Sequence, residues 1–224
     1  MTEHSNKPWR TLVFSQYPVN KQLTTYEVET PEFWNDIYDN KVPAWGKEPA
    51  EVLKTFLMYF PRSARILDIG CGEGRNSIHL SRLGYTVTGI DISSSAIERA
   101  KAKESKCTFY CMDALNDTLE ETFDVIIDFG LFHFMPHEYR EKYVDNIYSM
   151  LVNDGIYINQ SGRLTESPII GNLYTPPQLE RQELLDEFKK FTVKCIQEDV
   201  LPPYKHYGRY PCWNLLIQKT AEQQ

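Results

Sequence analysis

The sequence predicts a single α/β domain built on a largely parallel β-sheet, and three observations support this class. An apolar stretch at residues 65–69, a glycine-rich loop, a helical pattern at residues 76–83 and a second apolar stretch at residues 86–91 follow one another in the order of a β-α-β unit. Later apolar stretches also end in aspartate, at the strand ends where parallel sheets bind their ligands. The last two stretches, residues 191–197 and 213–219, have no helix between them, which is typical of antiparallel neighbours.

Length and composition exclude several classes of protein. The 224 residues suffice for one domain of this class and are too few for two domains of ordinary size. The formal net charge is -7 with Lys and Arg scattered along the chain, so we expect no nucleic-acid partner. Five irregularly spaced cysteines predict reduced thiols in a cytoplasmic protein, with no disulfide framework and no metal site. No stretch approaches the roughly 20 apolar residues of a membrane span, so we expect no membrane association.

Residues 1–48 are predicted to form an N-terminal segment with a lid, and residues 49–224 the main domain. The order of the first thirty residues cannot be predicted from their polar composition. Pro31 then starts a helical pattern that ends near Asn40. Its apolar face consists of Phe33, Trp34, Ile37 and Tyr38.

Trp45 lies in the Pro- and Gly-containing loop that follows this helix. Two interpretations stay open: Trp45 closes a lid over a ligand, or it packs the helix onto the domain surface. Residues 50–59 predict an amphipathic helix that leads into the first strand.

The loop Asp68-Ile-Gly-Cys-Gly-Glu-Gly74 is predicted to hold a ligand, because a Cβ at Gly70, Gly72 or Gly74 would occupy the space next to the backbone. A dinucleotide site places a G-x-G-x-x-G turn against a pyrophosphate, which a carboxylate would repel. Here the pattern is G-x-G-x-G, with Asp68 before it and Glu73 within it. Two acids suit a ligand that carries an amine and a sulfonium, which describes S-adenosylmethionine.

Asp91 ends the second predicted strand and should accept both hydroxyls of a ribose, because the end of a parallel strand borders the ligand crevice. The alternative is a surface carboxylate at a strand end. Ile92 should lie against one face of the adenine. Ser95 and Glu98 form the pattern of a capping box for a helix at residues 96–103.

The third and fourth predicted strands, residues 107–112 and 123–128, also end in acids. The same geometry makes Asp113 a candidate acceptor for the adenine amino group. The segment Asp128-Phe-Gly-Leu-Phe-His-Phe134 should lie beneath a methyl group that is transferred from such a ligand.

The C-terminal half continues the alternation of helices and strands. Pro136 suits the first turn of a helix, Asn153-Asp-Gly155 predicts a turn, and residues 156–160 predict the fifth strand. A further helix is expected over residues 175–188, before the two closing strands.

Together these motifs resemble the class I S-adenosylmethionine-dependent methyltransferases over residues 66–219. The resemblance rests on Leu-Asp-Ile-Gly-Cys-Gly-Glu-Gly74, Gly-Ile-Asp91, Met-Asp-Ala114 and Phe-Asp-Val-Ile-Ile-Asp128. It implies a Rossmann-like sheet of seven strands in the order 3-2-1-4-5-7-6, with strand 7 antiparallel and helices on both faces. The segments Gly74-Arg-Asn-Ser77, Phe33-Trp-Asn-Asp-Ile-Tyr38 and Pro43-Ala-Trp-Gly46 are similar to the tellurite-resistance and thiopurine methyltransferase branch, which acts on small molecules.

The resemblance also implies which residues bind the cofactor, S-adenosylmethionine. The methionine moiety would lie on the glycine loop, the ribose on the acid after strand two, and the adenine between the tips of strands two and three. The residues implied are Tyr38, Trp45, Asp68, Gly70, Cys71, Gly72, Asn76, Asp91, Ile92, Asp113, Ala114, Asp128 and Phe129.

Methyl transfer from a sulfonium is an in-line displacement, in which an oxygen or nitrogen acceptor needs a base and a soft sulfur, selenium or tellurium acceptor needs little more than alignment. His133 is the best-placed candidate base, the alternative being a structural role in its loop. His206 and Tyr207 are further candidates, unless they only form the wall of an acceptor pocket. Arg163 would pair with an acceptor carboxylate or be solvated.

We expect a methyltransferase that acts on a small-molecule acceptor as a monomer or homodimer. A non-catalytic domain that binds S-adenosylmethionine and docks a partner is the main alternative. A nicotinamide-dependent oxidoreductase is disfavoured by the G-x-G-x-G spacing and by the closing strand pair.

Overall fold

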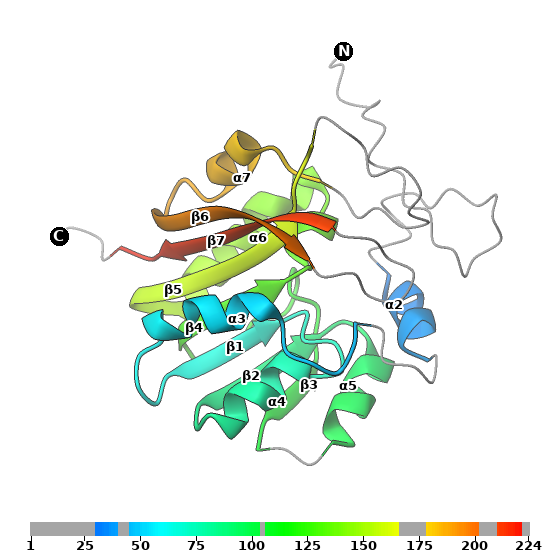
Figure 1. The fold of residues 1–224 in the computed structure, drawn as a ribbon. Coiled ribbons are helices and arrows are strands. Elements are labelled where there is room, and N and C mark those ends of the chain that lie inside the picture. Colours follow the sequence, from blue (N-terminus) through cyan, green and yellow to red (C-terminus); the bar gives the residue numbers. More distant parts are fainter. Residues whose placement is uncertain (1–29, 40–44, 104–105, 166–177, 202–209, 221–224) are drawn as a thin grey trace, which may run out of the picture.

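A computed structural model describes residues 30–39, 45–103, 106–165, 178–201 and 210–220 (Figure 1). These residues form one seven-stranded sheet with the order β3-β2-β1-β4-β5-β7-β6. Strand β7 is antiparallel to both β5 and β6, and the other pairings are parallel. The predicted strand order is therefore confirmed. The strands are β1 (Arg65–Ile69), β2 (Thr86–Asp91), β3 (Thr108–Cys111), β4 (Phe123–Phe129), β5 (Leu151–Gly162), β6 (Thr192–Leu201) and β7 (Tyr210–Gln218).

Helices pack against both faces of the sheet. Helix α2 lies apart from the others, near the upper end of α5 (Figure 1). The helices are α2 (Pro31–Tyr38), α3 (Glu51–Phe56), α4 (Arg75–Arg82), α5 (Ser94–Lys101), α6 (His137–Met150) and α7 (Arg181–Glu187). The 3₁₀ turn η2 (Leu57–Tyr59) follows α3, and the 3₁₀ turn η3 (Phe132–Phe134) precedes α6.

The core has two layers because successive side chains of a strand point to opposite faces of the sheet. On one face, Ile66, Val125 and Ile158 pack with Phe56 of α3. On the other face, Leu67, Ile126 and Tyr157 pack with α6 and α7. Because β1 to β5 pair in parallel, their carboxyl ends lie at the same edge of the sheet.

Three local predictions differ from the structure. The N-cap of α5 is Ser93, whose hydroxyl accepts a hydrogen bond from the Ala96 amide, so the helix starts earlier than the predicted capping box at Ser95. Pro136 is the N-cap of α6 and precedes its first turn. Strand β5 begins at Leu151 directly after α6, and the predicted turn lies inside it, with Asp154 at φ 62°. A register shift between Phe123 and Val125 absorbs this irregularity.

Within the described part of the chain, no helix has the length and apolar character that crossing a membrane requires. The same residues contain no group of three or more His, Cys, Asp or Glu side chains that could hold a metal ion.

Candidate functional site

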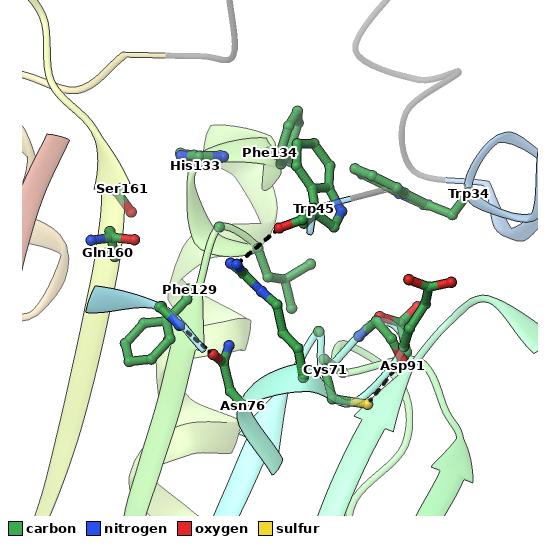
Figure 2. A pocket seen from close by; sticks show the side chains of 18 of the residues that line it. Trp34, Trp45, Cys71, Asn76, Asp91, Phe129, His133, Phe134, Gln160 and Ser161 are labelled. Carbon is green, nitrogen blue, oxygen red and sulfur yellow. Dashed lines mark hydrogen bonds between the residues drawn. The ribbon is translucent and has the colours of Figure 1, made fainter. Parts of the chain in front are cut away.

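A cavity of about 510 Å³ lies at the sheet edge where β1, β2, β4 and β5 end. Helix α2 and residues 45–51 form its roof, and the tips of the parallel strands form its floor. Figure 2 shows aromatic rings of Trp34, Trp45 and Phe134 gathered above the loop that carries Cys71.

The glycine loop is shaped by the protein's own packing. Gly72 has φ +54°, and a Cβ there would lie 2.6 Å from the Tyr38 hydroxyl oxygen. Gly74 has φ +74°, and a Cβ there would lie 2.8 Å from the Phe109 ring. Gly70 and Gly72 line the cavity, so packing against the protein's own side chains adds a second steric reason for glycine beside the predicted approach of a ligand.

Asp91 lines the cavity at the end of β2. Its Oδ2 accepts a hydrogen bond of 2.8 Å from the Gly72 amide, and its Oδ1 accepts one of 2.9 Å from the Ser93 amide. Each oxygen thus receives one backbone donor and keeps a second lone pair. Burial raises the pKa of Asp91 to about 6, although both backbone hydrogen bonds oppose this shift.

The two acids of the glycine loop, Asp68 and Glu73, differ in their surroundings. Asp68 is buried and is not part of the cavity wall, and its Oδ2 accepts a 2.5 Å hydrogen bond from the Ser77 hydroxyl. Burial raises the pKa of Asp68 to about 7. Glu73 lines the cavity but pairs with Arg99 at 2.5 Å. Of Asp68, Glu73 and Asp91, it is therefore Asp91 that lines the cavity without an ion pair to a described cationic side chain.

The roof is held by hydrogen bonds to the glycine loop and to α5. The Arg75 Nη1 donates to the carbonyl oxygens of Trp45, at 2.9 Å, and of Glu48, at 3.1 Å. The Trp45 indole Nε1 donates to the Tyr38 hydroxyl at 3.1 Å. Trp45 thus lines the cavity and also anchors α2, and its role as a lid over a ligand stays a prediction.

Asn35 attaches α2 to the N-terminus of α5. Its Oδ1 accepts hydrogen bonds from the Ser93 hydroxyl at 2.8 Å and from the Ser95 amide at 3.2 Å. Asn76 has an equivalent task at the other side of the roof, where its Oδ1 accepts from the Ala50 amide at 2.8 Å. Asn76 also lines the cavity.

The tips of β3 and β4 contribute unequally. Ile92, Asp113, Ala114 and Phe129 line the cavity. Asp128 does not; it is fully buried. Its carboxylate accepts hydrogen bonds from two backbone amides and from the hydroxyls of Tyr143, at 2.6 Å, and Tyr157, at 2.9 Å. Asp128 therefore ties β4 to α6 and β5.

His133 lines the cavity, but its hydrogen bonding does not suit a general base. Its Nδ1 accepts a 2.8 Å hydrogen bond from the Gly162 amide, and desolvation, helped by Arg140, lowers its pKa to about 3. The imidazole is consequently neutral and carries its single proton on Nε2. His206 and Tyr207 lie outside the described residues.

Arg163 is not part of the cavity wall. Its guanidinium lies 3.2 Å from a Glu198 carboxylate oxygen and 5.5 Å from the centre of the Trp213 ring. The predicted role in binding an acceptor carboxylate has no support from this position.

Several lining residues were not predicted. The rule applied to β2, β3 and β4, that strand ends face the ligand, also applies to β5 and would have found Gln160 and Ser161. Trp34 was predicted only as part of an apolar helix face. The unpredicted lining residues include Trp34, Met112, Gln160, Ser161, Tyr210 and Cys212, whereas Leu131 and Phe134 lie in the segment that was expected beneath the methyl group.

Comparison with known proteins gives a consistent result. Residues 66–155 match the family described as methyltransferase domain. The chain is 35% identical over 113 residues to the 2-heptyl-1-hydroxyquinolin-4(1H)-one methyltransferase of Mycobacteroides abscessus. The match covers 47% of this chain and 49% of that protein. The chain spans 49% to 60% of the length of the first curated relatives that it matches.

Solved structures share the fold. A protein from a structure on conversion of a disulfide bond into a thioacetal group during echinomycin biosynthesis superposes with a TM-score of 0.71 at 23% identity, covering 88% of this chain and 93% of the other. TehB from Haemophilus influenzae gives a TM-score of 0.62 at 20% identity, covering 85% of this chain and 67% of that protein.

Proposed function

We propose that this chain, whose residues 66–155 match the methyltransferase domain family, is an S-adenosylmethionine-dependent methyltransferase that transfers a methyl group to a small-molecule acceptor by in-line displacement. Residues 49–224 would form the catalytic domain and residues 1–48 the N-terminal segment and lid. The observation that carries the proposal is the carboxylate of Asp91, which lies at the floor of a roofed cavity with one lone pair free on each oxygen.

The cavity fits the cofactor. Two hydroxyls on adjacent ribose carbons match the two free lone pairs of Asp91, and a pyrophosphate would meet this carboxylate unfavourably. Ile92 and Ala114 offer apolar contact beside Asp113, which suits an adenine ring with an exocyclic amine. Gly70, Cys71, Gly72 and Asn76 would hold the methionine end, under Tyr38 and Trp45. We assign Asp68 and Asp128 to supporting the loop and β4 from behind.

When bound, S-adenosylmethionine supplies a methyl group on a positively charged sulfur. The chain's own residues would align the acceptor with that methyl group and exclude water, and such orientation can contribute up to roughly 7 to 11 kcal/mol to lowering the barrier. The aromatic roof of Trp34, Trp45 and Phe134 serves the exclusion of water.

A nucleophile that ionises easily or needs no deprotonation suits this site best. His133 is neutral and already protonated at Nε2, so it cannot take a proton there. We therefore favour a soft sulfur, selenium or tellurium acceptor, or an acidic hydroxyl, over an amine or an alcohol. The name of the Mycobacteroides abscessus relative, a methyltransferase of a hydroxyquinolone, supports a small aromatic acceptor of this kind.

The test has two steps. Isothermal titration calorimetry with S-adenosylmethionine and with NAD should show binding of the first only. Transfer of labelled methyl from the cofactor to a panel of thiols, selenols, tellurite, phenols, carboxylates and amines should then identify the nucleophile. Binding of NAD in place of S-adenosylmethionine would refute the proposal. Cofactor binding without transfer to any acceptor would favour a non-catalytic S-adenosylmethionine-binding domain.

We further propose a cytoplasmic monomer or homodimer without a nucleic-acid or membrane partner. Light scattering of the purified chain with and without the cofactor tests the oligomeric state. The scattered basic residues support the absence of a nucleic-acid partner, which a gel-shift assay with DNA and RNA would check.

A further inference from the structure

The half of the cavity opposite Asp91 differs in character from the cofactor half. It is lined by His133, Phe134, Gln160, Ser161 and Tyr210. None of these side chains carries a formal charge at neutral pH, since His133 is neutral. Trp34 stacks edge-on against Phe134 with ring centres 5.2 Å apart and continues the aromatic wall. The side chains named here are thus aromatic or uncharged polar groups.

Gln160 has an amide whose orientation is dictated from outside the cavity. The Asp199 carboxylate only accepts hydrogen bonds, so the Asn214 Nδ2 must face it, at 2.8 Å. The Asn214 Oδ1 then faces Gln160 and accepts a 2.8 Å hydrogen bond from its Nε2. This relay crosses from β6 through β7 to β5 and leaves the Gln160 Oε1 toward the cavity. Figure 2 shows the Gln160 oxygen on the cavity side.

His133 is oriented from the other direction. The Gly162 amide donates to Nδ1, which leaves the proton on Nε2. Gly130 lies beneath this edge of the ring, because a Cβ there would be 3.9 Å from the His133 Nε2. Hence one uncharged donor, the His133 Nε2–H, and one uncharged acceptor, the Gln160 Oε1, are oriented by hydrogen bonds to the Gly162 amide and the Asn214 side chain.

We propose that His133 and Gln160 form a donor–acceptor pair that selects an uncharged aromatic acceptor with a hydrogen-bond acceptor and a hydrogen-bond donor on one edge. Lactams and aryl carboxamides have such an edge. This inference rests on the proposed function, since it concerns the substrate of the same reaction. Asp199 and Asn214 are positioning residues that act through Gln160.

The pair also predicts which acceptors are rejected. A carboxylate offers two acceptors and no donor, so one of its oxygens would face the Gln160 Oε1 without a hydrogen bond between them. An ammonium offers only donors, so it would leave the His133 Nε2–H without an acceptor. The site would therefore discriminate against carboxylate and ammonium acceptors, because their complexes would leave polar groups without hydrogen-bond partners.

Matched probes test the proposal. In the presence of S-adenosylhomocysteine, benzamide should bind at least roughly tenfold more tightly than benzoate, which has the same shape and no donor. In the transfer assay para-mercaptobenzamide should have the lower KM and para-mercaptobenzoate the higher one, with thiophenol between them. Equal binding of benzamide and benzoate, or tighter binding of benzoate, would overturn the proposal.

Variants assign the selectivity to these residues. Gln160→Met keeps the length of the side chain and removes the oxygen, and His133→Asn keeps an acceptor for the Gly162 amide and removes the Nε2–H donor. Each should raise the KM for para-mercaptobenzamide roughly tenfold with little change in the KM for thiophenol or for S-adenosylmethionine. Gln182→Met, on the exposed face of α7, is the matched control and should change none of these values.

Asp199→Asn tests the relay. An amide at position 199 can donate as well as accept, so the side-chain amides of Asn214 and Gln160 could exchange the positions of their oxygen and nitrogen atoms. Its KM for para-mercaptobenzamide should rise by a smaller factor than in Gln160→Met at an unchanged melting temperature, and Asp199→Glu should restore it. An unchanged KM in both Gln160→Met and His133→Asn would remove the pair from substrate recognition. The benzamide and benzoate titrations need no turnover, so they decide this inference even where the transfer assay fails.

Discussion

Asp91 performs two tasks with one carboxylate. Its two oxygens orient the glycine loop and the start of α5 by accepting from the Gly72 and Ser93 amides, and the same oxygens face the cavity. A group with both tasks cannot be removed without affecting stability as well as binding, because two buried amides lose their acceptor.

Asp91→Ala should therefore weaken the binding of S-adenosylmethionine by roughly 100-fold or more and destabilise the fold by about 1 to 3 kcal/mol. Calorimetry gives the affinity, and urea unfolding gives the free energy of unfolding. Glu141→Ala, at an exposed carboxylate of α6 that does not line the cavity, serves as the control for loss of one negative charge. An affinity unchanged in Asp91→Ala would remove this residue from the site.

The pKa of Asp91 predicts a pH dependence of cofactor binding. Hydroxyl donors need the ionised carboxylate, and burial raises its pKa from 3.8 to about 6 in the free protein. The affinity should thus fall by up to roughly tenfold per pH unit below about pH 6 and level off above about pH 7. Binding should release protons in this range.

Calorimetry in buffers of different ionisation enthalpy measures that release. The stability of the free protein should change in the opposite direction, since a carboxylate with a raised folded-state pKa stabilises the fold most at low pH and loses this contribution as pH rises through about 6. Affinity that stays constant from about pH 5 to about pH 8 would contradict the prediction.

At the scale of elements, the lid and the glycine loop are built to match each other. Tyr38 of α2 occupies the space that a side chain at position 72 would need, and Trp45 and Arg75 hold the roof from the other side. The loop and the helix are far apart in sequence, so their fit is a tertiary property. Asn35 completes it by joining α2 to α5.

Gly72→Ala should impair lid closure, because its Cβ would lie 2.6 Å from the Tyr38 oxygen and its φ of +54° disfavours any side chain. We expect a roughly tenfold or larger rise in the dissociation rate of S-adenosylhomocysteine, measured by stopped-flow fluorescence of the lid tryptophans. Adding Tyr38→Phe removes the clashing atom and should restore part of the loss. A double variant as impaired as Gly72→Ala alone would assign the effect to backbone strain and not to the lid.

At the scale of the whole molecule, Asp128 connects the two sides of the sheet edge. It accepts from backbone amides of η3 and from the hydroxyls of Tyr143 in α6 and Tyr157 in β5. Burial raises the pKa of Asp128, while all these hydrogen bonds lower it. The carboxylate thereby positions the loop that carries Leu131 and His133 under the cavity.

Asp128→Ala should destabilise the protein by about 3 kcal/mol or more, because three buried donors and one partly buried donor lose their acceptor. Chemical denaturation measures this loss. The fraction that stays folded should still bind S-adenosylmethionine within a few-fold of the original affinity, since Asp128 does not line the cavity. Loss of binding without loss of stability would return Asp128 to the cofactor site.

The sequence alone predicted the alternation of strands and helices, the antiparallel closing pair, the bounds of most elements to within a few residues, and the position of the cavity at the strand ends. These features depend on local patterns, since apolar periodicity and glycine turns are properties of neighbouring residues. The strand order was implied by the family resemblance, and the sheet confirms it. The alternation of strands and helices also indicated that Asp91, Asp113 and Phe129 would lie at one edge, where the structure has them.

Only the tertiary structure decided which polar groups face the cavity and in which state. Asp68 and Asp128 follow the same strand-end rule as Asp91, yet Ser77, Tyr143 and Tyr157 turn them into the core. The proton of His133 is set by an amide 29 residues away, and the amide of Gln160 by an asparagine 54 residues away. A pattern along the chain predicts where a side chain begins, whereas its hydrogen-bond partners come from segments that only folding brings together.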